Sequence, residues 1–169
     1  MAIRTLDEKL VHDLGDIYDA EHRFLEAQQE MLQHAHAQQV QMLLTEHIAQ
    51  TQQQIDNINQ IYKLMGMTPA RVKCDAAAGL VIEGQKSLKE TSGAPLIQDV
   101  MIANAASKVE HYEIASYRGL IEGAKLMGNQ QVLALLQQNL QQEEQTAMKI
   151  EQSTPMLLNQ AMSANQLGQ

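Results

Sequence analysis

The segment from Pro95 to Met127 constrains the fold most strongly, because it has the pattern of one long amphipathic helix with charges on its apolar face. Two carboxylates, Glu110 and Glu113, occupy a stripe that is otherwise mostly apolar. Since an unpaired buried carboxylate is strongly unfavourable, these groups must be protonated, paired, hydrated or bound to metal. The inward positions, three and four residues apart, are Ala103, Ala106, Glu110, Glu113, Tyr117, Leu120 and Ala124.

Three other segments show the same helical period with polar residues on the inward face. They cover about residues 6–34, 40–65 and 130–152. The period slips between the first two, which predicts a tight turn near Gln33–Gln38 although no Gly or Pro marks it. Acidic residues off the stripe, such as Asp19, are expected to be solvated. The inward polar positions are Glu21, His47, Thr51, Gln54, Asn139, Glu143 and Thr146.

A shorter helix is expected at Asp75–Glu90, between the two pairs of long helices. Two αα-hairpins joined by a long crossover define the ferritin-like variant of the four-helix bundle. We therefore predict an all-α fold with a ferritin-like four-helix bundle over residues 1–152 and a short extra helix. Ser153-Thr154-Pro155 should end the last helix and leave residues 153–169 as a C-terminal tail.

Charge and composition exclude several classes of function. The chain has 20 acidic and 12 basic residues, a formal net charge of −8, and no basic cluster, so we expect no nucleic-acid binding. No apolar run approaches the ~18 residues of a membrane span, and the N-terminus lacks the apolar core of a secretory signal. Cys74 is the only cysteine, which suits a reducing cytoplasm and a packing role. We expect a cytoplasmic protein without a membrane partner.

The inward polar residues are placed at matching positions in the two hairpins. Glu143 follows Glu110 by 33 residues, and Gln54 follows Glu21 by the same 33. Inward carboxylates with a histidine are the arrangement by which bundles bind two iron or manganese ions, and such centres reduce dioxygen or peroxide. The candidate metal ligands are Glu21, His47, Gln54, Glu110, Glu113 and Glu143.

The pattern departs from the usual dimetal signature, which has Glu-x-x-His on the second helix of each hairpin. The corresponding stretches here are Gln54-Ile55-Asp56-Asn57 and Glu143-Glu144-Gln145-Thr146. His47 lies two turns from Gln54, about 10 Å along the helix, so it supplies an imidazole only if the site is shifted toward the first turn. The alternative is a metal-free hydrogen-bonded network, with Tyr18, Tyr117, Thr51 and Gln54 as partners, in a structural or interaction module.

The chain resembles the YciE/YciF ferritin-like stress-protein family of bacteria. The most specific stretch is Lys108-Val109-Glu110-His111-Tyr112-Glu113-Ile114-Ala115-Ser116-Tyr117. Other matching stretches are Asp16-Ile17-Tyr18-Asp19-Ala20-Glu21, His47 with Thr51 and Gln54-Ile55, Lys73-Cys74, Gly79-Leu80 and Glu143-Glu144. The likeness covers roughly residues 4 to 152.

This resemblance implies a four-helix bundle whose short extra helix, Asp75–Glu90, lies at a homodimer interface. It also implies kinship to rubrerythrin-type dimetal proteins, with Glu21, Glu110, Glu113 and Glu143 as inward carboxylates and His47 as inward imidazole. Gln50 stands where relatives often carry an acidic residue. We expect a stress-associated protein that binds iron or manganese, with two ions per chain in a dimetal centre, and acts as a dimetal oxidase or peroxidase or handles iron. The protein partner is unknown.

Overall fold

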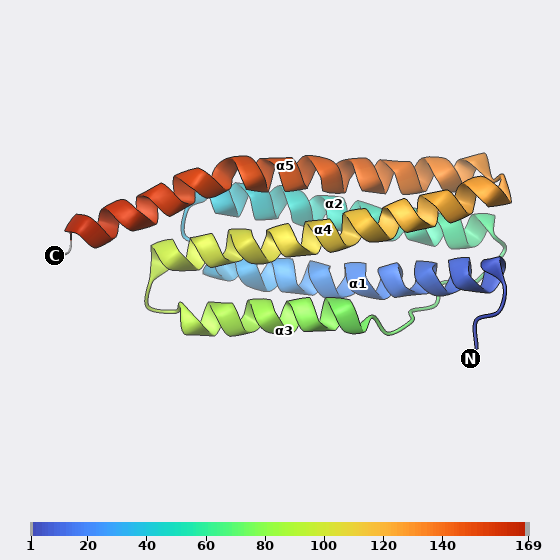
Figure 1. The fold of residues 1–169 in the computed structure, drawn as a ribbon, viewed down its shortest axis with the longest axis horizontal. Helices are drawn as coiled ribbons and strands as arrows, with labels where there is room; N and C mark the ends of the chain where they lie inside the picture. The colour runs from blue at the N-terminus through green and yellow to red at the C-terminus, as the bar shows by residue number, and fades with distance from the viewer. Residues whose placement is uncertain (1, 168–169) are drawn as a thin grey trace.

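The computed structural model describes residues 2–167, and helices form most of that range (Figure 1). Each predicted helix is present within two residues of its expected bounds, except at the end of the last one. None of the described helices combines the length and apolarity that crossing a bilayer requires. The helices are α1 (Leu6–His34), α2 (Gln38–Leu64), α3 (Asp75–Glu90), α4 (Pro95–Met127) and α5 (Gln130–Leu167).

The four long helices form a bundle in which each packs against two neighbours. Helix α1 contacts α2 and α4, and α5 contacts the same two helices from the opposite corner. The connection from α2 to α4 contains α3, which lies outside the bundle against α1 and α4 (Figure 1). The predicted all-α fold, a ferritin-like bundle with a short extra helix, is confirmed.

The end of α5 differs from the prediction. The helix does not stop at Ser153 but continues to Leu167, with Pro155 inside it. Proline cannot donate a backbone hydrogen bond to the preceding turn, so α5 is locally destabilised at Pro155. Burial of Leu157 and Ala161 offsets that cost, because both side chains pack onto the bundle rather than into water. The predicted end of the helix at Ser153 was wrong, because tertiary packing outweighed the local preference of proline to end a helix.

The turn between α1 and α2 is closed by a side chain from α4. Ala37, the residue before α2, has no capping side chain of its own. Asp99 is buried and accepts hydrogen bonds from the backbone N–H groups of His36 and Ala37, each at 2.8 Å. An N-cap residue normally accepts hydrogen bonds from the free N–H groups at the start of its own helix. Asp99 accepts such bonds beside the start of α2, although it belongs to α4. This explains a tight turn without Gly or Pro.

Replacing Asp99 by alanine should destabilise the protein by about 2–4 kcal/mol, because two backbone N–H groups at the turn lose a buried, charged acceptor. Urea unfolding followed by circular dichroism measures this change. Asp56→Ala is the matched control, since Asp56 lies exposed on α2 and should change stability by no more than about 0.5 kcal/mol. Equal effects of the two substitutions would show that Asp99 does not hold the turn.

Asp19 fixes the connection between α2 and α3 onto α1. Its buried carboxylate accepts hydrogen bonds from Arg23 Nε at 2.5 Å, Arg71 Nε at 2.8 Å and the backbone N–H of Cys74 at 3.0 Å. Burial alone would raise the pKa of Asp19, but these hydrogen bonds outweigh it and lower the pKa. The expectation that Asp19 is solvated was wrong, because two of its partners come from a distant connection.

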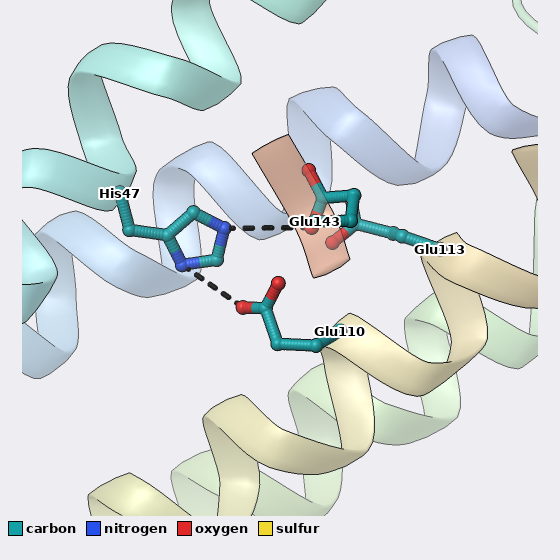
Figure 2. Close-up of side chains that lie close together, drawn as sticks. All are labelled: His47, Glu110, Glu113 and Glu143. Carbon is teal, nitrogen blue, oxygen red and sulfur yellow. Dashed lines mark ion pairs between the residues drawn. The ribbon is translucent and has the colours of Figure 1, made fainter. Parts of the chain in front are cut away.

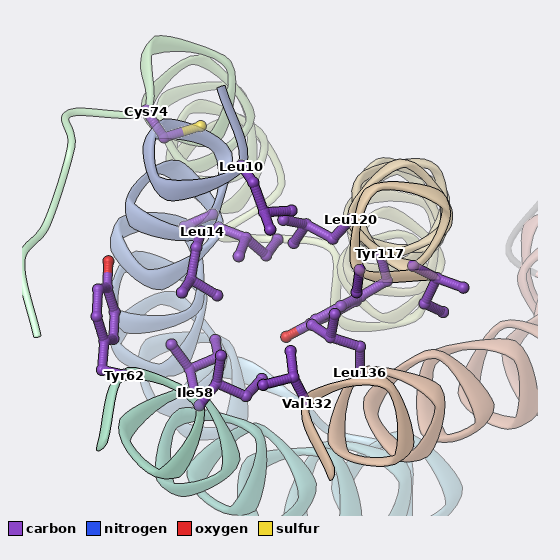
Figure 3. Packing of buried hydrophobic residues seen from close by; sticks show 14 of the residues in the cluster. Leu10, Leu14, Ile58, Tyr62, Cys74, Tyr117, Leu120, Val132 and Leu136 are labelled. Atoms are coloured by element: carbon purple, nitrogen blue, oxygen red, sulfur yellow. The ribbon is translucent and has the colours of Figure 1, made fainter. Parts of the chain in front are cut away.

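Two apolar clusters fill the bundle on either side of a polar section. On α2, His47, Thr51 and Gln54 lie between Leu44 of one cluster and Ile58 of the other. The first cluster includes Leu10, Leu14, Ile58, Tyr62, Cys74, Tyr117, Leu120, Val132 and Leu136 (Figure 3). The second, near the α1–α2 turn, comprises Met31, Ala35, Val40, Leu44, Leu88, Ile102, Ala103, Ile150 and Leu157. Cys74 packs as predicted.

Candidate metal centre

All four long helices contribute polar side chains to the section between the two apolar clusters. Glu110 and Glu113 lie one turn apart on α4 and therefore share its inward face. The inward faces predicted from the helical period are buried, and none of the six candidate ligands is more than 3 % exposed. These residues are Glu21 on α1, His47 and Gln54 on α2, Glu110 and Glu113 on α4, and Glu143 on α5.

Four of these residues converge on one point (Figure 2). One ligand atom from each of His47, Glu110, Glu113 and Glu143 lies within 4.8 Å of the other three. Nδ1 of His47 is 3.1 Å from Oε1 of Glu110, and Nε2 of His47 is 3.9 Å from Oε2 of Glu143. The imidazole thus reaches the carboxylates, and the cluster lies nearer the α1–α2 turn than Gln54 does. We call these four residues the His47 cluster.

Glu21 and Gln54 border the His47 cluster without joining its four converging atoms. The side-chain amide of Gln54 donates a hydrogen bond to Oε1 of Glu143. The Tyr117 hydroxyl donates to Oε1 of Glu21 and accepts a hydrogen bond from Asn139 Nδ2 at 2.9 Å. One oxygen of Glu143 and one oxygen of Glu21 are thus held by hydrogen bonds, and the second oxygen of each carboxylate has no partner.

Further hydrogen-bonding residues surround this arrangement. Gln28 Nε2 lies 3.3 Å from both ring nitrogens of His47, and its Oε1 accepts a hydrogen bond from Thr51 at 3.1 Å. Asn57 donates to Asn139 Oδ1 at 2.7 Å. Thr51 and Asn139 were predicted to face inward, and Gln28 lies on the same helical stripe as Glu21. The sequence did not predict Asn57, which lies off the inward stripe of α2.

Tyr18, one of the partners expected in a metal-free network, lies elsewhere. Its hydroxyl donates to Asn59 Oδ1 at 2.9 Å, at the side of the α1–α2 pair. The predicted partners Tyr117 and Gln54 do bond to carboxylates of the site, and Asn139 joins them through Tyr117.

Most carboxylate oxygens of the site have no hydrogen-bond donor among the described residues. Both oxygens of Glu110 and of Glu113 are buried and unpartnered, as are one oxygen of Glu21 and one of Glu143. Oε1 of Glu110 is close to His47, but no ring N–H is aligned with it. Buried polar atoms are normally satisfied, so a concentration of free acceptor oxygens requires protons, water or a cation.

Burial also sets the protonation of the site. Removal from water raises the pKa values of Glu21, Glu110 and Glu113 well above the ordinary 4.5, and the neighbouring carboxylates raise them further. Burial lowers the pKa of His47, against the opposing attraction of Glu143 and Glu46. The metal-free site therefore favours protonated carboxyl groups and a neutral imidazole.

The donor atoms fit a first-row divalent cation. Carboxylate oxygen and neutral imidazole nitrogen are suitable ligands for iron and manganese. Atoms on opposite sides of such an ion lie about 4.2 Å apart, twice a bond length of ~2.1 Å. The observed spacing of up to 4.8 Å needs the side chains to close by only about half an ångström. The unpartnered oxygens supply the free lone pairs.

Fold and site together define a class of protein: an all-α, ferritin-like helical bundle with a buried carboxylate and histidine cluster. Residues 5–163 match the family described as a domain of unknown function (DUF892), and the chain belongs to this family. It is 30 % identical over 151 residues to protein YciF of Escherichia coli strain K12, which covers 89 % of this chain and 90 % of YciF. The resemblance to the YciE/YciF family is confirmed, and the match continues beyond residue 152.

Solved structures agree with this assignment. The E. coli stress protein YciF superimposes with a TM-score of 0.87 at 28 % identity, covering 93 % of this chain and 99 % of YciF. YcfI of Rhodopseudomonas palustris, described as a candidate structural protein, gives a TM-score of 0.85 at 34 % identity, covering 88 % and 94 %. A protein of Xanthomonas campestris shares the fold at 22 % identity, with a TM-score of 0.75 and coverage of 95 % and 98 %.

Proposed function

We propose that the protein binds iron or manganese as a carboxylate-bridged pair of ions in the polar section of the bundle. The observation that carries this proposal is the set of buried, unpartnered carboxylate oxygens around His47. Hydrogen bonds from the protein would satisfy these oxygens if the residues served only to hold the helices together. Their lone pairs are instead directed toward one another.

Charge balance favours two ions over one. The four buried carboxylates Glu21, Glu110, Glu113 and Glu143 carry four negative charges when ionised. Two divalent cations neutralise these charges, whereas with one ion two of the carboxyl groups would have to stay protonated, and a protonated carboxyl group is not available as a ligand. His47 adds a neutral donor because burial lowers its pKa, so it contributes a ligand without adding positive charge.

Each residue has a distinct role in this proposal. His47, Glu110, Glu113 and Glu143 would hold the ions, and Glu21 would contribute from the Tyr117 side. Gln54 orients Glu143, and Tyr117 orients Glu21, through the hydrogen bonds already described. When bound, the metal pair supplies electrons for the reduction of dioxygen or peroxide. The apolar clusters above and below exclude water from the reacting region.

Mixing anaerobically loaded ferrous protein with dioxygen or hydrogen peroxide tests the reaction. We expect stoichiometric consumption of one oxidant and conversion of ferrous to ferric iron faster than for free ferrous iron in the same buffer. His47→Ala should slow this conversion, because it removes the only imidazole of the cluster. Oxidation at the rate of free iron in the wild-type protein would reject the redox function.

A second candidate is a structural module that acts as a homodimer through α3. Ile82 on α3 is 66 % exposed, and the relative YcfI is described as a candidate structural protein. Ile82→Glu should then shift the protein from dimer to monomer in sedimentation equilibrium, while unfolding stability stays within about 0.5 kcal/mol. A wild-type protein that is monomeric at all concentrations would exclude this candidate.

A further inference from the structure

Two small cavities border His47. The first is bounded by α1, α2, α3 and α4 and includes Phe24, Ala27, Val81 and Ala105 in its wall. The second is bounded by α2, α4 and α5. Each has a volume of about 20 Å³, which is room for one molecule of water size. His47, Leu44 and Ala106 line both cavities.

The walls of these cavities are almost entirely hydrocarbon. Gln28 and His47 are the polar residues of the first cavity, and Thr146 and His47 those of the second. A buried water usually needs two to four polar partners. The amide of Gln28 already faces His47 and Thr51, and the Thr146 hydroxyl donates to Gln50 Oε1 at 2.9 Å. Little hydrogen-bonding capacity is left for water or for hydrogen peroxide.

We propose that these two cavities admit and hold a neutral, apolar molecule of diatomic size beside the His47 cluster, which identifies dioxygen rather than peroxide as the oxidant. The chemical meaning of this inference rests on the proposed function, whereas the binding of an apolar gas does not. Ions and larger substrates are excluded by the alkyl walls and by the volume.

Helix α3 contributes apolar side chains to the wall of the first cavity. Leu80 and Val81 of α3 form part of the wall of the first cavity, on the side away from α2. Both are partly buried and pack against the bundle core. Helix α3 therefore covers one approach to His47 with apolar side chains, so that a molecule entering there crosses hydrocarbon and not a polar channel.

Dioxygen itself is the suitable probe, because it is paramagnetic and speeds the relaxation of the nuclei beside it. Methyl relaxation of metal-free protein labelled at alanine is recorded under increasing dioxygen pressure, with nitrogen as the diamagnetic pressure control. We expect a stronger relaxation enhancement of the Ala106 methyl signal, which borders both cavities, than of the Ala147 signal. Equal enhancement at both alanines would overturn the proposal.

Filling the cavities provides the second arm. Ala106→Leu should abolish the extra dioxygen-induced relaxation at Ala27 and Ala103, and Ala106→Val replaces this variant if the leucine variant does not fold. Ala147→Leu is the matched control, because Ala147 is a buried alanine that lines neither cavity. Extra dioxygen-induced relaxation that persists at these methyl groups in the folded Ala106 variant would also overturn the proposal.

A final experiment distinguishes failure of the dioxygen cavities from failure of the proposed metal function. In ferrous-loaded protein, Ala106→Leu should slow dioxygen consumption at least about tenfold, an increase in barrier of roughly 1.4 kcal/mol, without changing the metal-to-chain ratio. Enhanced relaxation at Ala106 in a protein that never binds metal would support the gas cavities and reject the metal function. Metal binding without enhanced relaxation at Ala106 would reject the gas cavities and support the metal function. Unchanged dioxygen consumption in the Ala106 variant would reject the cavities as the route of dioxygen entry.

Discussion

Replacing Glu110 and Glu113 together by glutamine is expected to abolish metal binding and to stabilise the metal-free protein. The four oxygens of these two carboxylates are buried and lack hydrogen-bond donors. Glutamine keeps the shape but cannot ionise, so folding no longer has to desolvate or protonate these two carboxylates or oppose their repulsion with Glu143 and Glu21. Removing unfavourable buried charge typically stabilises by about 1–4 kcal/mol. The same change removes two of the ligands on which a cation depends.

Urea unfolding of the metal-free forms and calorimetric titration with manganese measure the two effects. Glu26→Gln with Glu122→Gln is the control pair, because both residues are exposed and the net charge changes equally. The control should bind manganese like the wild type and unfold within about 0.5 kcal/mol of it. If the Glu110 and Glu113 variant bound manganese with wild-type affinity, these residues would not be ligands. A less stable variant would mean that the carboxylates hold the fold together.

The stability of the metal-free protein should fall as pH rises from about 5 to 8. Unfolded, the three carboxyl groups Glu21, Glu110 and Glu113 titrate near 4.5, and in the fold burial raises their pKa values well above that. At pH values between the unfolded-state and folded-state pKa, the folded protein holds more protons than the unfolded chain, so raising the pH favours unfolding. The slope should approach about 1.4 kcal/mol per pH unit for each group that titrates only in the unfolded chain.

His47 contributes with the opposite sign over part of this range. Its folded pKa lies below the ordinary 6.5, so the unfolded chain binds more protons there and stability rises with pH up to about 6.5. Partial burial lowers the pKa of His22 as well. Two histidines therefore oppose three carboxyl groups, so the net slope stays negative. Saturating manganese should reverse the slope, because protons compete with the metal for the same oxygens.

Chemical unfolding at several pH values, with chelator or with manganese, checks this prediction. The variant with glutamine at positions 110 and 113 should show a shallower slope than the wild type. A metal-free wild-type protein whose stability increases throughout this range would contradict the assignment of protonated carboxyl groups to the site.

The helical period in the sequence predicted which side chains face inward. Glu21, His47, Gln54, Glu110, Glu113 and Glu143 were all placed on inward stripes, and all are buried. That success has a simple cause: burial repeats every three to four residues along one helix, and no knowledge of its neighbours is needed.

Features that depend on a second helix could not be predicted in the same way. The relative axial position of α2 and α4, which brings His47 beside Glu110, has no signature within either segment. Asp99 closes a turn more than sixty residues away in sequence. Helix α5 continues through Pro155 because the bundle buries Leu157. In each case a tertiary contact decides the outcome, and local propensity is only a weak prior.

The most direct test of the metal site is the metal-to-chain ratio after anaerobic loading. Protein freed of metal is incubated with ferrous iron or manganese, separated from unbound ions, and analysed for metal and protein together. The charge balance at Glu21, Glu110, Glu113 and Glu143 predicts two ions per chain in the wild type and none in the variant with glutamine at positions 110 and 113. A ratio near one would contradict the bridged pair, and a ratio near zero in the wild type would contradict the metal site altogether.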